Sequence, residues 1–290
     1  MLFFNNFDEK AQNALKQFQH FLFVSQKPCK MKRRSFLKNS VLTAGGAAFA
    51  LPALSTQPAP GSEKNLFELR IYHISRAANA KGILEEYFKD ALIPYLNKNK
   101  VSFAAFNEYS LEEPVKLFVI LAYPDASSYF SVQSAWFSDP VFLEASKKYN
   151  KLPASGAVYS RFETFLLEAF DQFPALRIPT EKKGLFELRI YESASEDAGR
   201  RKIAMFNQEE IALFLKVGFQ PVFFGKVLAG EYMPALIYML GFKDMADRDT
   251  AWNRFASHDD WNTMRVKPEY ADTVSNIRRI FLTPAPYSQV

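Results

Sequence analysis

The hexapeptide Phe67-Glu-Leu-Arg-Ile-Tyr72 recurs unchanged as Phe186-Glu-Leu-Arg-Ile-Tyr191 in a chain of 290 residues. A match of this length is improbable by chance, so it indicates that a whole structural unit is duplicated. Within each hexapeptide apolar and polar residues alternate, as they do in a β-strand whose two faces meet different surroundings. The sequence therefore predicts two copies of one domain, each beginning with this strand.

The residues after each hexapeptide predict the same order of elements in both copies. Helical periodicity follows the first strand, and then come two strands separated by a polar turn, further helices and a last strand. The predicted strands are 66–74, 101–110, 115–124 and 157–168, then 185–192, 219–228, 233–242 and 274–283; the helices are 80–98, 126–150, 199–216 and 244–267. Both copies read βαββαβ, so we expect an α+β fold of tandem ferredoxin-like repeats over 65–170 and 185–285, joined by a linker at 171–184.

A four-stranded sheet of this order carries helices on one face and leaves the other face bare. The second copy can cover that bare face. We therefore expect the two antiparallel sheets to pair into a dimeric α/β-barrel-like arrangement. A monomer with an internal pseudo-dimer and a homo-oligomer both agree with this pattern.

Alternation along the two first strands separates an apolar row from a polar row. We expect the apolar row to face the helices, and the polar row to face the space between the sheets. With His73, the polar row supplies the candidate ligand-binding residues: Glu68, Arg70 and Tyr72 in the first copy, and Glu187, Arg189 and Tyr191 in the second. An arginine there could receive an anionic ligand while a tyrosine or glutamate handles a proton. Alternatively, each Glu and Arg form an ion pair that stabilises the interface.

Other residue types point to structure more than to chemistry. His73 and His258 are too few and too far apart in sequence for a metal or haem site unless the fold joins them, so no metal is expected. Trp136, Trp252 and Trp261 lie in the second helical regions, where we expect structural aromatic anchors. The chain has no phosphate-binding glycine loop, His-Glu-x-x-His helix or Gly-x-Ser-x-Gly motif, so catalytic residues stay unassigned. No cofactor is implied, and haem and flavin both stay open.

Residues 31–55 contain the charged, apolar and small-residue regions of a signal peptide. Arg33 and Arg34, followed by Ser-Phe-Leu-Lys, resemble the twin-arginine export motif. The apolar stretch is short and rich in Gly and Ala, so we expect no stable membrane span. The sequence therefore predicts a periplasmic or otherwise exported protein, with the twin-arginine export machinery as a partner. We expect residues 1–30 to lie outside the fold, either because translation starts at Met31 or as an amphipathic helix over 8–24.

The net positive charge of the chain arises in its first 55 residues. Residues 1–55 hold eight of the 36 Lys and Arg but only two of the 31 Asp and Glu, so the remainder is close to neutral. A nucleic-acid-binding domain needs a basic surface of its own, and we therefore expect no nucleic-acid partner. The only cysteine is Cys29, so the exported part has no thiol nucleophile and forms no disulfide within itself.

The Phe-Glu-Leu-Arg-Ile-Tyr strand, the element at Trp136 to Pro140 and the βαββαβ order resemble the NIPSNAP domain, present twice over about residues 65–285. In the second copy, Asp259-Asp-Trp261 lacks the proline of the first. The resemblance implies a dimeric α/β-barrel fold, whose wider relatives include cofactor-free monooxygenases, haem-degrading enzymes and binding proteins. NIPSNAP domains have no well-established reaction.

Two hypotheses follow from these observations. In the first, the chain is a binding or interaction protein whose space between the sheets holds a small apolar or anionic ligand, or is simply packed. In the second, it is an oxidoreductase of the barrel-monooxygenase or haem-associated kind, and its aromatic interior excludes water from a substrate. Whether the chain is an enzyme stays open at this stage, because no acid, base or ligand set stands out.

Overall fold

The computed structural model describes residues 64–110 and 113–290. The predicted leader at 31–55, the extension at 1–30 and Cys29 lie outside the described residues. Within those residues, none of the helices has both the length and the apolar character needed to cross a membrane.

The first repeat has the predicted order of elements. Its elements are β1 (Leu66–Ile74), α2 (Ala80–Tyr87), the π-helical turn η1 (Phe88–Leu92), α3 (Ile93–Lys98), β2 (Ser102–Glu108), β3 (Lys116–Tyr123), α4 (Ala126–Ala135), η2 (Trp136–Ser138), α5 (Pro140–Ala145), α6 (Lys147–Asn150), η3 (Ala154–Gly156) and β4 (Tyr159–Ala169). The predicted helix 80–98 is thus one helical segment interrupted by a π-helical turn.

The second repeat follows the same plan. Its elements are β5 (Leu185–Glu192), α7 (Glu196–Met205), the π-helical turn η4 (Phe206–Glu210), α8 (Ile211–Lys216), β6 (Gln220–Ala229), β7 (Ala235–Phe242), α9 (Met245–Ala256), α10 (Asp259–Met264), η5 (Pro268–Tyr270) and β8 (Asn276–Pro284). Corresponding helices begin at corresponding caps: the side chains of Asp125 and Asp244 each accept a backbone N–H three residues on, at the starts of α4 and α9.

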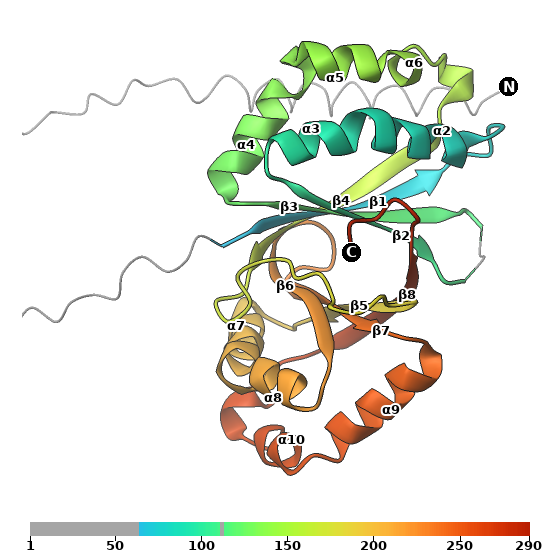
Figure 1. The fold of residues 1–290 in the computed structure, drawn as a ribbon. Coiled ribbons are helices and arrows are strands. Elements are labelled where there is room, and N and C mark those ends of the chain that lie inside the picture. Colours follow the sequence, from blue (N-terminus) through green and yellow to red (C-terminus); the bar gives the residue numbers. More distant parts are fainter. Residues whose placement is uncertain (1–63, 111–112) are drawn as a thin grey trace, which may run out of the picture. The chain divides into compact units, whose positions relative to one another are not determined.

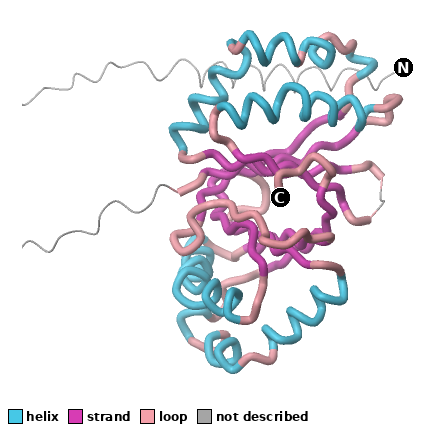
Figure 2. Tube along the Cα trace, viewed as in Figure 1, coloured by secondary structure: helices cyan, strands magenta, loops and turns pink. Residues whose placement is uncertain are grey.

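The eight strands close into one antiparallel barrel in the order β1-β3-β2-β8-β5-β7-β6-β4. Each repeat contributes four adjacent strands, and the two seams are the short pairings of β2 with β8 and of β4 with β6. The helices of the first repeat cover one side of the barrel and those of the second cover the other (Figures 1 and 2). The predicted fold class is confirmed, and the barrel closes within a single chain.

The inside of the barrel is filled with apolar side chains from both repeats. Phe67 of β1 packs against Phe223 of β6 with ring centroids 5.2 Å apart, and Phe106 of β2 packs against Phe186 of β5 at 4.9 Å. The other members of this buried cluster include Leu69, Ile71, Ile120, Leu188, Ile190, Ile237 and Met239. Of the two possibilities that the sequence left open for this space, the packed one describes the structure.

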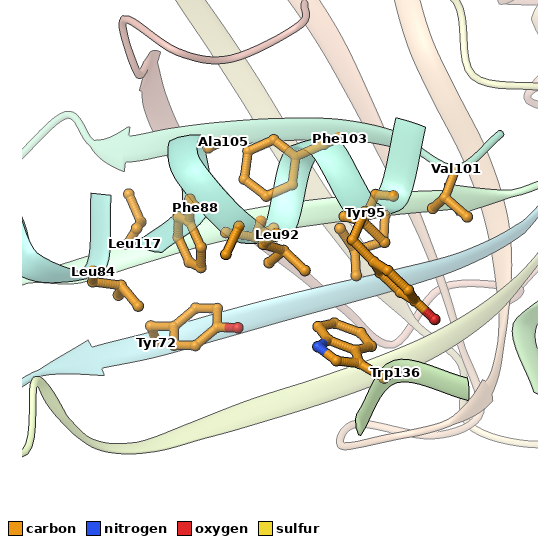
Figure 3. Packing of buried hydrophobic residues seen from close by; sticks show 14 of the residues in the cluster. Tyr72, Leu84, Phe88, Leu92, Tyr95, Val101, Phe103, Ala105, Leu117 and Trp136 are labelled. Carbon is orange, nitrogen blue, oxygen red and sulfur yellow. The ribbon is translucent and has the colours of Figure 1, made fainter. Parts of the chain in front are cut away.

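The predicted orientation of the first strands was wrong. The apolar row of each hexapeptide faces the barrel interior, and the Glu-Arg-Tyr row faces the helices. Figure 3 shows Tyr72 in the layer formed with Leu84, Phe88 and Trp136, between the sheet and the helices of the first repeat. The reason is energetic: joining two sheets creates the most water-excluded volume of the fold, and the apolar row fills it without leaving a polar group unpaired.

Candidate functional site

In the first repeat the polar row forms a closed hydrogen-bond network under the helices. Arg70 Nε and Nη2 donate to the two carboxylate oxygens of Glu68 at 2.6 and 3.0 Å. The Tyr123 hydroxyl and the Gln133 amide each donate to Glu68 Oε2 at 3.1 Å. Glu68 and Arg70 are buried, and the Arg70 guanidinium lies over the Trp136 ring. The predicted ion pair exists, but it joins the sheet to its helices instead of joining the two sheets.

In the second repeat a different cation holds the strand carboxylate. Arg248 of α9 donates to both oxygens of the fully buried Glu187, at 2.9 and 3.1 Å, and the Trp252 indole donates to Glu187 Oε2 at 2.8 Å. Arg189 reaches Glu187 only at 3.4 Å, and its guanidinium instead stacks on Trp252 at 4.2 Å. Glu187 therefore binds α9 to the sheet, and Arg189 is the less tightly held cation.

The tyrosines of the row are buried in the same layer. Tyr238 of β7 donates a hydrogen bond to the Tyr191 hydroxyl at 2.9 Å. Burial raises the pKa of Tyr191 to about 12, and burial also raises the pKa of Tyr238 well above its ordinary value. Both hydroxyls are therefore neutral donors at ordinary pH and cannot act as bases there.

The two histidines have separate local roles. His73 is 6% exposed and lies at one end of β1, where its Nε2 is 2.7 Å from Glu163 of β4. His258 is the N-cap of α10: its Nδ1 accepts the backbone N–H of Asp260. The fold does not bring them together, and no group of three or more His, Cys, Asp or Glu side chains within residues 64–110 and 113–290 could hold a metal ion.

The tryptophans pack in the helical layers. Trp136 is buried in the cluster of the first repeat, and Trp252 and Trp261 pack against the cluster of the second. The first two do not occupy equivalent places, however. Counted from the caps Asp125 and Asp244, Trp252 stands where the first repeat has Gln133.

A pocket of about 630 Å³ opens between α7 and the hairpin that connects β6 to β7. Most of its wall is apolar, and charged groups stand among the remaining lining residues. The pocket is lined by Gly199, Ile203, Val227, Leu228, Met233, Pro234 and Ala235, together with Glu196, Arg200 and Lys226. Its wall on one side is α7, and two of its lining residues, Val227 and Ala235, also belong to the packed cluster of the barrel interior.

Sequence reasoning missed this pocket, and Gly199 in its wall gives no reliable sign of it. Gly199 stands inside α7, where glycine costs about 1 kcal/mol relative to alanine and so calls for a local reason. A Cβ placed there would meet Pro234 of the hairpin and Ser193 at ordinary contact distance, 3.6 Å. An alanine would therefore fit at this position, and the packing of α7 against the hairpin does not require the glycine.

Comparison with known proteins finds a family model that matches the second repeat. Residues 186–289 match the family model described as NIPSNAP, and no curated protein sequence matches the chain. The structure of a putative monooxygenase from Fusobacterium nucleatum is similar at 9% identity and TM-score 0.52, over 77% of this chain and 93% of that one.

Two further solved structures resemble the chain. One, a putative monooxygenase from Lactobacillus acidophilus, has 11% identity and TM-score 0.48 over 77% of this chain and 94% of that one. A NIPSNAP-like domain protein from Burkholderia xenovorans has 19% identity and TM-score 0.35, over 38% of this chain and 92% of that one. At these identities the Fusobacterium structure supports the fold alone.

Proposed function

We propose that this chain is an exported NIPSNAP-like protein with two repeats that binds a small, largely apolar molecule in the pocket between α7 and the β6–β7 hairpin. The pocket carries the proposal. Its volume of about 630 Å³ falls in the range of roughly 300–1,000 Å³ that small-molecule sites occupy. The other space that could have held a ligand, between the sheets, is filled with side chains.

The lining indicates the class of ligand. Ile203, Leu228 and Met233 offer apolar contact, and Met233 is more than half exposed although its side chain is unbranched and apolar. Lys226 on β6 points to the same pocket and forms no ion pair within the described residues, whereas Arg200 is held by Asp197 at 2.6 Å. An apolar body with one polar end near Lys226 fits this arrangement.

The carboxylates of the two polar rows, Glu68 and Glu187, do not compete with the pocket as ligand sites. Every oxygen of Glu68 and Glu187 already accepts at least one hydrogen bond from a neighbouring side chain. Opening either carboxylate to a ligand would unpair a buried charge, which costs several kcal/mol. Both carboxylates therefore support the fold and are closed to a ligand.

A neutral fluorescent probe tests the proposal. N-phenyl-1-naphthylamine is apolar and uncharged, so its fluorescence should rise saturably on titration with the full chain. Ile203→Trp fills the pocket and should weaken binding at least about tenfold. Leu215→Trp is the matched control: Leu215 lies on the next helix, α8, and is 47% exposed, so this variant should bind as the parent does. Equal binding by all three proteins would reject the pocket.

Export is the second part of the proposal, and it rests on Arg33 and Arg34 within the leader-like residues 31–55. Replacing both arginines with lysine should retain the protein in the cytoplasm of a bacterium that has twin-arginine export. The parent chain should reach the periplasm and lose its leader, as the mass of the purified protein will show. Export of the double variant at the parent level would argue against this route.

A second candidate function is an oxidoreductase, favoured by the likeness of the fold to the Fusobacterium structure. In that case the same pocket would hold an oxidisable apolar substrate. The absorption spectrum of the exported protein and oxygen uptake with a reduced aromatic substrate such as a hydroquinone separate the two functions. A chromophore band or enzyme-dependent oxygen uptake lost in Ile203→Trp supports oxidation, and probe binding without either supports simple binding.

A further inference from the structure

Two arginines stand directly opposite each other on neighbouring strands of the second repeat. In the register of β5 with β8, Arg189 pairs with Arg279, so both side chains project from the same face of the sheet, toward the helices. Directly opposite residues of an antiparallel pair have Cβ atoms about 4.5–5.5 Å apart, and like charges there destabilise the sheet. A third cation, Arg248, lies close by on α9.

The nearest acid is already occupied. Glu187 gives both oxygens to Arg248 and one also to Trp252. Arg189 is 8% exposed, its Nε is buried without a hydrogen-bond partner, and its single contact with Glu187 is 3.4 Å long. Arg279 is exposed and forms no ion pair within the described part of the chain. Glu187 is therefore shared between Arg248 and the more distant Arg189, and Arg279 has no carboxylate partner among the described residues.

The surface beside these arginines is apolar and open. Ile277 lies two residues before Arg279 on the same face of β8 and is 41% exposed, so the helices do not cover this part of the strand. Phe281, two residues after it, contacts Arg248, and the Trp252 ring lies under the Arg189 guanidinium. The cations thus border apolar surface with access to solvent.

The first repeat lacks this arrangement, which makes it a feature of the second repeat and not of the fold. Arg70 lies opposite Thr164, a neutral residue, and its own carboxylate neutralises it through two short hydrogen bonds. Tyr129 stands where the second repeat has Arg248. The same strand, with the same Glu and Arg, therefore forms a balanced pair in one repeat and an excess of positive charge in the other.

We propose that Arg189 and Arg279 together bind the carboxylate of a small organic acid, whose apolar part lies against Ile277 and Trp252. A carboxylate placed between the two guanidinium groups supplies acceptors for their N–H donors and a negative charge that offsets the repulsion across the strands. This site is separate from the α7 pocket, because the two share no residue. The proposed carboxylate site does not depend on ligand binding in the α7 pocket.

Benzoate and benzamide test the site on the full chain. They share an aromatic ring, but only benzoate carries the charge. Benzoate should bind saturably by calorimetry and raise the melting temperature, while benzamide should do neither. Arg279→Gln should weaken benzoate at least about tenfold. Without ligand, this variant should melt about 1–3 °C higher than the parent, because a like-charge pair is gone. If Arg279 had only a structural role, its replacement would not both weaken benzoate binding and raise the melting temperature.

The remaining variants complete the test. Arg189→Gln should also weaken benzoate at least tenfold; if it fails to fold, Arg279→Gln, which changes an exposed side chain, carries the test alone. Lys216→Gln, which removes an exposed cation of α8 outside both sites, is the control and should leave benzoate binding unchanged. Equal binding of benzoate and benzamide would overturn the proposal. So would unchanged benzoate binding by Arg279→Gln, or a loss of binding that follows Lys216→Gln instead.

Discussion

Gln133 and Trp252 occupy the same position of the two repeats, and each donates a hydrogen bond to the first-strand carboxylate of its own repeat. The Gln133 amide lies 3.1 Å from Glu68 Oε2, and the Trp252 indole lies 2.8 Å from Glu187 Oε2. Two unlike side chains thus perform one structural task, satisfying a carboxylate buried between sheet and helices. Glu187 has a further role, because it also accepts hydrogen bonds from Nε and Nη2 of Arg248.

We predict that Glu187→Gln destabilises the protein by about 3–5 kcal/mol, because it leaves Arg248 and Arg189 without a buried negative charge. Urea denaturation followed by circular dichroism measures the change. Glu144→Gln is the control: Glu144 forms an exposed pair with Lys147, and its loss should change stability by less than about 0.5 kcal/mol. A small effect of Glu187→Gln would mean that the carboxylate does not hold the helical layer.

The buried pair of Lys202 and Glu210 gives a second prediction. Their side chains meet at 2.7 Å, and both are almost fully buried. Counted from the π-helical turns, they stand where the first repeat has Leu84 and Leu92. Lys202→Leu alone should cost about 3–5 kcal/mol, whereas the double change to leucine should be neutral or stabilising. A double variant as unstable as the single one would contradict this.

Alkaline stability should depend on Tyr191. Its folded-state pKa of about 12 exceeds the ordinary value of 10, so the unfolded chain loses this proton first as the pH rises. The stabilisation is complete below pH 10 and is lost between about pH 10 and 12, amounting to about 3 kcal/mol. Tyr191→Phe should be less stable than the parent at pH 7, and the difference should shrink as the pH rises from 9 to 11.5. A constant difference over that range would show that Tyr191 does not titrate in this way.

Two glycines near the proposed pocket should respond oppositely to alanine. Gly199→Ala should be neutral or stabilise by up to about 1 kcal/mol, because the helix gains propensity and the added Cβ meets nothing closer than 3.6 Å. Gly230→Ala should destabilise by about 1–3 kcal/mol, because φ is +144° and the Cβ would approach Phe165 to 2.7 Å. Thermal melts of the two variants measure both effects, and equal melting temperatures would contradict them.

The repeat and the periodicity of the sequence were enough to predict the eight strands and the βαββαβ order. They could not predict which side each row faces, because both faces of the first strands are buried and alternation alone does not tell one buried face from the other. The partners that decide this, Gln133 and Trp252, lie far along the chain from Glu68 and Glu187.

The pocket was beyond prediction for a similar reason. Its walls come from α7 and from the β6–β7 hairpin, and α8 lies between these two segments in the sequence. No single stretch of sequence therefore determines the shape of the pocket. The excess charge around Arg189 depends on strand register, which places Arg279 opposite it and Thr164 opposite Arg70. The hexapeptide is identical in both repeats and gives no sign of this difference.

Native mass spectrometry of the exported protein, purified without added ligand, tests the central claim most directly. If the pocket between α7 and the β6–β7 hairpin binds a small molecule, the parent and Leu215→Trp should carry a stoichiometric non-covalent mass that Ile203→Trp lacks. The same extra mass in Ile203→Trp would contradict the account, as would a bare mass for all three proteins together with no binding of N-phenyl-1-naphthylamine.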